Sequence, residues 1–154
     1  PIVLGGVRQN LVEGRVLYVG DSAGQTKPTT GGGIYFGGMG ALLLAKAIAN
    51  KISDPKISLV DEYEKIWFSI FKNEIKLMKF ARKLYENMDN DKIERLFSIA
   101  KEFLSTKDVL EIDYDLHLSS IIKFIGVRNT LKICKEVFGN VVANRLKKFN
   151  NLIK

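Results

Sequence analysis

The glycines of this chain are concentrated near its beginning, and they constrain its fold more than any other feature. Eleven of the 13 glycines precede residue 41, and only Gly126 and Gly139 follow. The most distinctive stretch is VLYVGDSAGQTKPTTGGGI, residues 16–34. Its first four residues, Val16–Val19, predict a buried β-strand that ends at Gly20. A loop with one proline and a triple glycine follows, and we expect it to lead into a helix that begins near Ile34.

The loop suits a ligand that approaches the backbone closely. The first N–H groups of a helix have no partner within the helix and carry the positive end of its dipole. Gly31, Gly32 and Gly33 at that position would let an anion or a polarised carbonyl come near. Pro28 has no N–H group to satisfy, and Asp21 can accept hydrogen bonds from sugar-like hydroxyls. For the triple glycine alone, a tight turn with a close helix contact is the other interpretation.

Several kinds of site are excluded or disfavoured. No Gly-Lys-Ser/Thr follows the loop, so it is not a nucleotide-triphosphate P-loop, and the G-x-G-x-x-G dinucleotide pattern is absent. The lone cysteine, Cys134, excludes an intramolecular disulfide and a thiolate cluster for zinc or iron–sulfur. We interpret Cys134 as a small buried hydrophobe and His117 as structural, and we expect no metal. One acidic cluster is spaced unlike a calcium loop, which predicts a solvated turn: Asp108, Glu111, Asp113 and Asp115.

Most of the chain is helical in pattern. Over residues 34–50, Gly37, Ala41 and Ala45 form a stripe of small residues that would let a helix press closely on a neighbouring sheet or helix. A long helix is predicted from Leu59 to about Met88, followed by helices over residues 91–104 and in two or three segments of 119–154, broken at the two late glycines. The apolar stripe of the long helix predicts core residues: Trp67, Ile70, Phe71, Ile75, Met78, Ala81, Leu84 and Tyr85.

These elements predict an α+β fold that is mostly α. One or more short N-terminal strands and a glycine-rich loop lead into a helix, and an α-helical domain follows. Because Ser53-Asp54-Pro55 breaks the first helix, we expect one domain over residues 1–52 and another over 53–154. The chain starts at Pro1 in the style of a strand interior, so we expect it to be a fragment or a processed piece. The longest apolar stretch, around residues 34–49, contains glycines and Lys46 and is too short for a membrane span.

Positive charge is unevenly distributed. The formal net charge is +7, and residues 123–154 hold eight Lys or Arg against one acidic residue, Glu136. This basic end suggests an anionic partner, such as a phospholipid surface, a phosphate-bearing substrate or nucleic acid, or else a solvated face. A second basic set, Lys72, Lys76, Lys79 and Lys83, lies on one face of the long predicted helix. It is either a solvated edge or a basic ridge over a ligand headgroup.

The stretch VLYVGDSAGQTKPTTGGGIYFGGMGALLLAKAIA resembles the second flavin-binding motif of the geranylgeranyl reductase family, FAD-dependent enzymes of the aromatic-hydroxylase-like superfamily. That motif runs Gly-Asp-Ala/Ser-Ala-Gly, a variable stretch, a proline and a glycine-rich helix start. The resemblance covers about a fifth of the chain. The positions that match are Gly20, Asp21, Ser22, Ala23, Gly24, Pro28, Gly31, Gly32, Gly33 and Ile34.

The resemblance implies FAD as cofactor and an oxidoreductase as activity. Asp21 should bind the ribityl chain, and the backbone N–H groups of Gly33 and Ile34 should lie near the pyrimidine edge of the flavin, where they would stabilise negative charge on the reduced form. The cofactor-binding residues implied are Gly20, Asp21, Gly24, Pro28, Gly31, Gly32, Gly33 and Ile34.

The resemblance also implies a substrate and a missing part. Archaeal members of the family reduce C=C bonds in the isoprenoid chains of digeranylgeranylglycerophospholipids, so we expect an isoprenoid lipid substrate. Lys79 is our candidate for its phosphate, and no catalytic residue is identified. The N-terminal FAD-binding portion is absent, so the chain alone should bind FAD poorly and be inactive. We expect a cytoplasmic protein, with peripheral membrane contact as an option, and no nucleic acid partner.

Two alternatives stay open. One is another flavoprotein of the superfamily, a monooxygenase or a dehydrogenase. Gly24, where related hydroxylases tend to have His, favours the reductase branch. The electron-transfer-flavoprotein type of quinone oxidoreductase needs a cysteine cluster that Cys134 alone cannot form. The other alternative is a non-catalytic basic helical module that docks on membrane or nucleic acid, although docking alone does not require the glycine loop.

Overall fold

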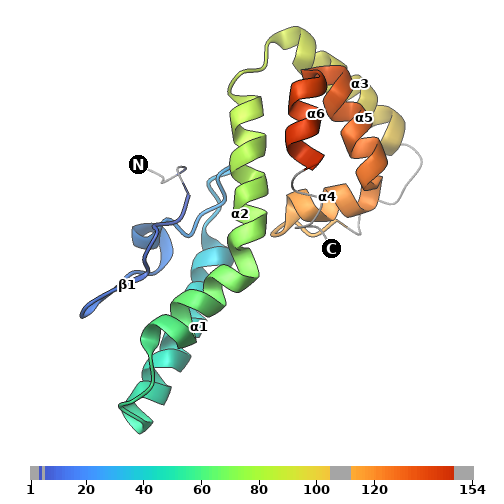
Figure 1. Ribbon diagram of the computed structural model, residues 1–154. Helices are drawn as coiled ribbons and strands as arrows, with labels where there is room; N and C mark the ends of the chain where they lie inside the picture. Colours follow the sequence, from blue (N-terminus) through green and yellow to red (C-terminus); the bar gives the residue numbers. More distant parts are fainter. Residues whose placement is uncertain (1–3, 5, 105–111, 148–154) are drawn as a thin grey trace. The chain divides into compact units, whose positions relative to one another are not determined.

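The computed structural model describes residues 4, 6–104 and 112–147 of the chain (Figure 1). Mostly helices are present, with one two-stranded sheet near the start, so the predicted α+β, mostly α class is confirmed. The chain divides into two compact units, Pro1–Lys79 and Phe80–Lys154. The predicted boundary between residues 52 and 53 separates the C-terminal segment of an FAD-binding domain from an α-helical C-terminal domain, and it stays a prediction.

The first unit begins with a small hairpin. Strand β1 (Val12–Glu13) pairs antiparallel with β2 (Val16–Leu17), with Val12 opposite Leu17. Gly14, at φ +61°, makes the turn between them. The predicted strand is therefore shorter than Val16–Val19. It is also not buried, because Val16 is 51% exposed and, in the described part of the chain, β2 pairs with β1 alone.

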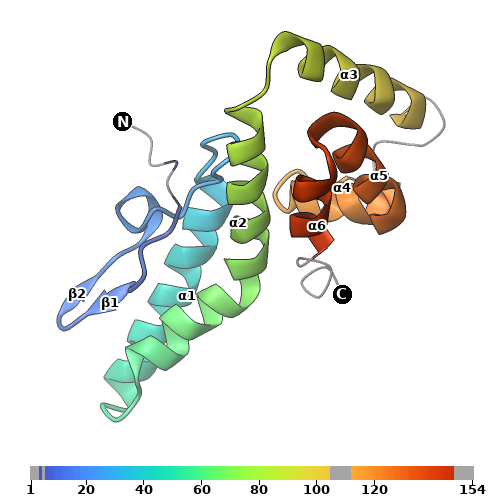
Figure 2. The same ribbon diagram turned by 45° about the horizontal axis from the view of Figure 1, so that its top comes forward.

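A turn and a loop connect the hairpin to two long helices. The 3₁₀ turn η1 (Gly20–Ala23) precedes the loop, and α1 (Ile34–Ser53) follows it. After a short bend, the π-helical turn η2 (Val60–Lys65) runs directly into α2 (Ile66–Tyr85). Figures 1 and 2 show α1 and the first part of α2 side by side, with the hairpin next to them. The long predicted helix is thus confirmed over most of its length.

An aromatic cluster forms the core between α1 and α2. The rings of Phe36 and Phe71 lie 4.8 Å apart between centroids, and those of Trp67 and Phe71 lie 5.0 Å apart. The indole N–H of Trp67 donates to the carbonyl of Phe36 at 3.3 Å. The side chains at 63, 67, 71, 75 and 78 recur on one face of the helix, and all are buried. Of the predicted core residues, Ile70 lies off this stripe and is exposed, and Tyr85, the last residue of α2, is exposed as well.

The buried face of α1 is not the predicted stripe of small residues. Its buried residues are Phe36, Gly40, Leu44 and Ala47. Ala41 and Ala45 point to solvent, and only Gly37 of the stripe makes a close approach, to the backbone of Gly20. Within the described residues, the predicted close contact is therefore made by Gly37 and not by Ala41 or Ala45. The large aromatic side chains of α2 instead favour the face that carries Phe36 and Leu44.

The second unit is a set of short helices. They are α3 (Asn90–Leu104), α4 (His117–Ile125), α5 (Val127–Phe138) and α6 (Asn140–Lys147). Gly126 and Gly139, at φ +87° and +83°, make the predicted breaks. Ile122, Val137, Ala143 and Leu146 are buried within it.

The residues singled out in this unit have ordinary structural places. Cys134 is half-buried on α5, and burial raises the pKa of its thiol to about 11. His117 begins α4. The carboxylate of Asp113 accepts hydrogen bonds from the backbone N–H groups of Asp115 and Leu116, as a solvated turn would. The other two members of the acidic cluster, at 108 and 111, lie outside the described residues. No helix in the described part of the chain is both long and apolar enough to cross a membrane.

Gly40 should be the least replaceable glycine of α1. An added Cβ would overlap the buried side-chain amide of Gln25, whereas one at Gly38 would meet nothing within 4 Å. We expect Gly40→Ala to destabilise the chain by about 1–3 kcal/mol, as overpacking does. Gly38→Ala is the matched control and should stabilise by up to about 1 kcal/mol through helix propensity. Urea unfolding of the two variants measures both changes, and equal stabilities would contradict the packing described here.

Candidate functional site

The first half of the glycine-rich loop is folded onto its own backbone. The N–H of Gln25 donates to the carbonyl of Gly20 at 3.0 Å, and the N–H of Gly24 donates to that of Asp21 at 3.0 Å. Gly20 and Gly24 both have positive φ, +63° and +67°. A Cβ at Gly24 would also lie 2.6 Å from the carbonyl oxygen of Gly6. These two glycines are therefore required by the shape of the loop itself.

The second half of the loop closes in the same way. The N–H of Lys27 donates to the carbonyl of Gly32 at 2.9 Å, and the N–H of Gly31 donates back to the carbonyl of Lys27 at 2.8 Å. Gly31 has φ +75°, and Pro28 is buried. Gly32 is different, because a Cβ there would meet no atom closer than 3.5 Å and its φ is not positive. Nothing in the described part of the chain requires glycine at 32.

The loop brings the carboxylate of Asp21 against Gly33. A Cβ on Gly33 would lie 3.1 Å from Oδ1 of Asp21 and 3.2 Å from a methyl carbon of Thr26. The side chain of Asp21 is exposed, and no described residue donates a hydrogen bond to its carboxylate. The absence of a side chain at Gly33 thus leaves a free acceptor directly beside the start of α1.

The start of α1 supplies open donors at the same place. Gly33 is the residue before the helix, and it makes no side-chain cap. Among the described residues, none accepts a hydrogen bond from the backbone N–H of Gly33 or Ile34. The side chain of Ile34 is 96% exposed. Two open N–H groups at the positive end of a 20-residue helix, next to a free carboxylate, can bind a ligand that carries both a hydroxyl and an electron-rich acceptor.

A buried hydrogen-bond chain holds this loop to the helices. The N–H of Gly20 donates to Oε1 of Gln25 at 2.8 Å, and Nε2 of Gln25 donates to the hydroxyl of Tyr63 at 3.0 Å. That hydroxyl in turn donates to the carbonyl of Tyr18 at 2.6 Å. Gln25 and Tyr63 are fully buried. Burial is the main cause that raises the pKa of Tyr63, so its hydroxyl keeps the proton that the chain of hydrogen bonds needs.

A neighbouring carboxylate performs the same task for the hairpin. Glu64 accepts hydrogen bonds from the backbone N–H groups of Leu11 and Val12, at 2.6 and 3.0 Å. Sequence reasoning missed Gln25, Tyr63 and Glu64. Tyr63 carried a usable signal, because it lies one helical turn before Trp67 on the apolar stripe. Gln25 and Glu64 carried none, since their partners are distant in sequence.

The predicted site residues thus fall into two groups. Asp21, Gly33 and Ile34 come together at the start of α1, and Gly20, Gly24, Pro28, Gly31 and Gly32 form the loop that carries them. Lys79 is not among the residues that contact this loop segment. Its side chain packs against Gly6 and lines a cleft beside α2. The roles of all nine residues in ligand binding stay predictions.

Comparison with known proteins gives a partial likeness to lipid reductases. An uncharacterized protein of Methanocaldococcus jannaschii is 35% identical over 96 residues, which are 62% of this chain and 24% of that protein. Digeranylgeranylglycerophospholipid reductase 1 of Methanosphaera stadtmanae is 26% identical over 141 residues, 88% of this chain and 34% of the reductase. The digeranylgeranylglycerophospholipid reductase of Methanocaldococcus jannaschii is 33% identical over 110 residues, 70% of this chain and 28% of the reductase.

These matches support the relationship to geranylgeranyl reductases that the glycine-rich segment predicted, and the two named relatives are oxidoreductases. The chain spans about a quarter to a third of the length of the curated relatives it matches. No family model matches the chain. No solved structure matches it either.

Removal of the Tyr63 hydroxyl tests the buried hydrogen-bond chain. Tyr63→Phe leaves the amide of Gln25 and the carbonyl of Tyr18 without their partner, and we expect a loss of about 1–3 kcal/mol in unfolding free energy at neutral pH. Because the folded pKa of Tyr63 is raised, its contribution is complete below the unfolded value of about 10 and is lost as pH rises through the folded pKa.

The difference in stability between wild type and Tyr63→Phe should therefore shrink above about pH 10. Unfolding measured over neutral to alkaline pH gives this difference. The other four of the five tyrosines are the same in both proteins, so their contributions cancel in the difference. A difference that stays constant to high pH would show that the hydroxyl does not act as a buried donor.

Proposed function

We propose that the loop from Gly20 to Ile34 holds part of an FAD in an oxidoreductase that reduces C=C bonds of isoprenoid lipid chains. One observation carries the proposal: the free carboxylate of Asp21 lies beside Gly33, at a helix start whose backbone N–H groups are open. A flavin dinucleotide has the complementary groups, a hydroxylated ribityl chain next to a polar ring edge.

The residues present fit this cofactor. The carboxylate of Asp21 would accept a hydrogen bond from a ribityl hydroxyl, and the N–H groups of Gly33 and Ile34 would donate to the pyrimidine edge of the ring. When bound, FAD supplies hydride transfer. The positive end of α1 favours negative charge at the ring edge, so this helix start would stabilise the reduced form without moving.

The substrate part of the proposal has separate support. Two of the related proteins are named as digeranylgeranylglycerophospholipid reductases. The proposed substrate is therefore a phospholipid with unsaturated isoprenoid chains. The proposal extends from those names to this chain because the glycine-rich motif occurs here with its Asp21 and Gly33 side by side.

The proposal also requires a further part of the binding site. The chain covers only about a quarter to a third of its relatives. One face of α1 is apolar but exposed, with Leu42 at 64% and Ile52 at 79%, and Ala41, Ala45 and Ala49 on the same face are also exposed. Exposed apolar faces of this kind are typical of surfaces that another part covers. We propose that a further part of a longer flavoprotein packs there and completes the FAD site.

Two substitutions test the flavin loop. In the protein expressed together with its adjoining coding sequence, Asp21→Ala removes the ribityl acceptor and should weaken FAD binding about ten- to a hundredfold, the range for a hydrogen bond to a charged group. Gly33→Ala places a methyl group against Asp21 and should weaken binding comparably. Lys101→Ala, at an exposed position of α3, is the control. Flavin fluorescence titration measures the affinities, and unchanged affinity in both variants would refute the assignment.

Mass spectrometry of the lipid tests the reaction. The FAD-loaded protein, reduced with dithionite and incubated with a geranylgeranyl lipid, should add about two mass units per reduced double bond, from one hydride and one proton. A yellow protein that leaves the lipid unchanged would indicate another flavoprotein reaction. A colourless protein would overturn the flavin assignment and favour the basic binding module.

A further inference from the structure

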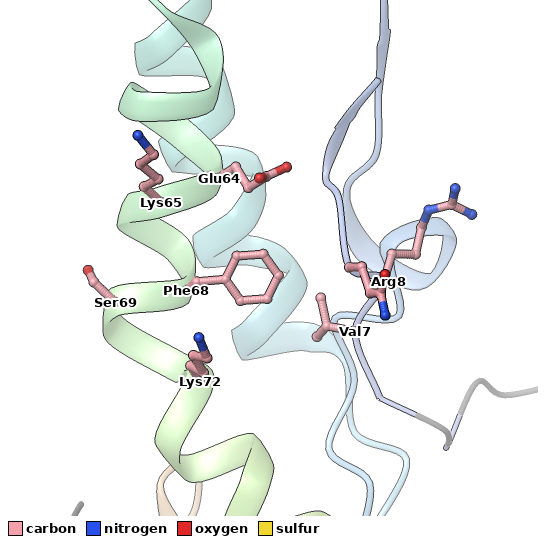
Figure 3. Close-up of a pocket in the computed structure, with 8 residues that line it drawn as sticks. Val7, Arg8, Glu64, Lys65, Phe68, Ser69 and Lys72 are labelled. Atoms are coloured by element: carbon pink, nitrogen blue, oxygen red, sulfur yellow. The ribbon is translucent and has the colours of Figure 1, made fainter. Parts of the chain in front are cut away.

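A groove runs along α2 in the first unit, where residues 7–9 pass beside the helix. It consists of two adjoining clefts, of about 590 and 160 Å³, that share Val7, Phe68 and Lys72 as lining residues. Figure 3 shows the ring of Phe68 reaching from α2 toward Val7, with Lys72 one turn further along the helix. We call the whole the Phe68 groove. Nothing in the described geometry of the flavin loop uses it.

The smaller cleft combines an apolar wall with a row of cations. Val7, Trp67, Phe68 and Ile75 line it, and so do three lysines at positions 72, 76 and 79. These lysines follow one another at spacings of four and three, on successive turns of one helix. The described lining of this cleft contains no acidic side chain.

The three lysines are not neutralised. None of them makes an ion pair or a hydrogen bond with any described residue. In the larger cleft, by contrast, Arg8 is paired with Glu13 at 3.2 Å and Lys65 with Asp61. Like charges at these spacings destabilise a helix, so an anion at the lysine row would relieve their mutual repulsion. The uncompensated charge therefore lies at the smaller cleft.

We propose that the Phe68 groove binds an anionic amphiphile, with a phosphate on Lys72, Lys76 and Lys79 and the first part of a hydrocarbon chain against Phe68 and Val7. A free phosphate would leave the apolar wall unused, and a neutral hydrocarbon would leave the lysines unused. The inference rests on the proposed function in one respect: it identifies the amphiphile as the headgroup end of the phospholipid substrate.

The chain contains its own reporter for this groove. Trp67 is the single tryptophan of the sequence and lines the smaller cleft. A decyl phosphate brominated on its chain should therefore quench Trp67 fluorescence when it binds to the 154-residue chain. This signal needs no flavin, so it separates failure of the groove from failure of the proposed function. Quenching in a protein that binds no FAD would support binding at the groove and would count against the proposed function only.

A pair of triple variants with equal charge tests the contacts. Lys72→Ala/Lys76→Ala/Lys79→Ala should lower the affinity for the brominated decyl phosphate about a hundredfold, since each lysine near an anionic group raises the affinity about fivefold. Lys83→Ala/Lys101→Ala/Lys123→Ala removes three exposed lysines that do not line the groove and should leave the affinity unchanged. Equal affinities of the two triple variants would overturn the proposal. In wild type, the affinity should also fall as salt rises, and a salt-independent affinity would overturn it too.

Three further probes define the occupant. Brominated decanol should bind much more weakly than the phosphate, which would confirm the role of the lysines. Inorganic phosphate should displace the probe only at high concentration. Displacement by inorganic phosphate as strong as that by decyl phosphate would overturn the amphiphile proposal in favour of a plain anion site. Quenching by brominated anionic vesicles without any by the single-chain phosphate would overturn it in favour of a membrane surface.

Discussion

The side-chain amide of Gln25 is the interaction on which the first unit of this protein depends. An amide offers an acceptor and a donor at one end, and Gln25 uses both, toward the N–H of Gly20 and the hydroxyl of Tyr63. It thereby joins a loop to a helix 38 residues further along the chain. Burial makes each of these bonds costly to lose. Gly40 belongs to the same arrangement, since only a residue without a side chain leaves room for the Gln25 amide beside α1.

This fixed loop decides what the start of α1 presents. The loop is tied at Gly20, and the exposed carboxylate of the next residue, Asp21, lies beside Gly33. The donors of the helix start and the acceptor of Asp21 are therefore positioned before any ligand arrives. The residues that would touch a cofactor come from one short segment, whereas this segment is held in place by its own Gln25 together with Tyr63 of η2 and the space left at Gly40 of α1. The same division explains why a short motif can be recognisable while its supports are not.

The sequence predicted what depends on local rules and missed what depends on partners. Helical periodicity predicted the long helices, and the helices before Gly126 and Gly139 end there as predicted. Periodicity and helix ends both depend on residues that are close in sequence. The sequence did not predict which face of α1 packs within the described residues, since that is decided by Trp67 and Phe71 on another helix. In the site, the motif singled out Asp21 and Gly33, which the structure places side by side. It did not distinguish Gly24, which the backbone requires, from Gly32, which the described neighbours leave free.

The π-helical turn η2 has a consequence for how this chain tolerates change. A π-helical turn accommodates more residues than an α-helical one, and here it lets the adjacent residues Tyr63 and Glu64 reach the loop and the hairpin respectively. Deleting one residue from it would return the turn to about the α-helical count of residues, so Tyr63 and Glu64 could not both keep their present directions. The aromatic core of α2 could keep its register, but at least one of the two polar links would be lost. Length variation at this point of the sequence is therefore coupled to the shape of a loop forty residues earlier.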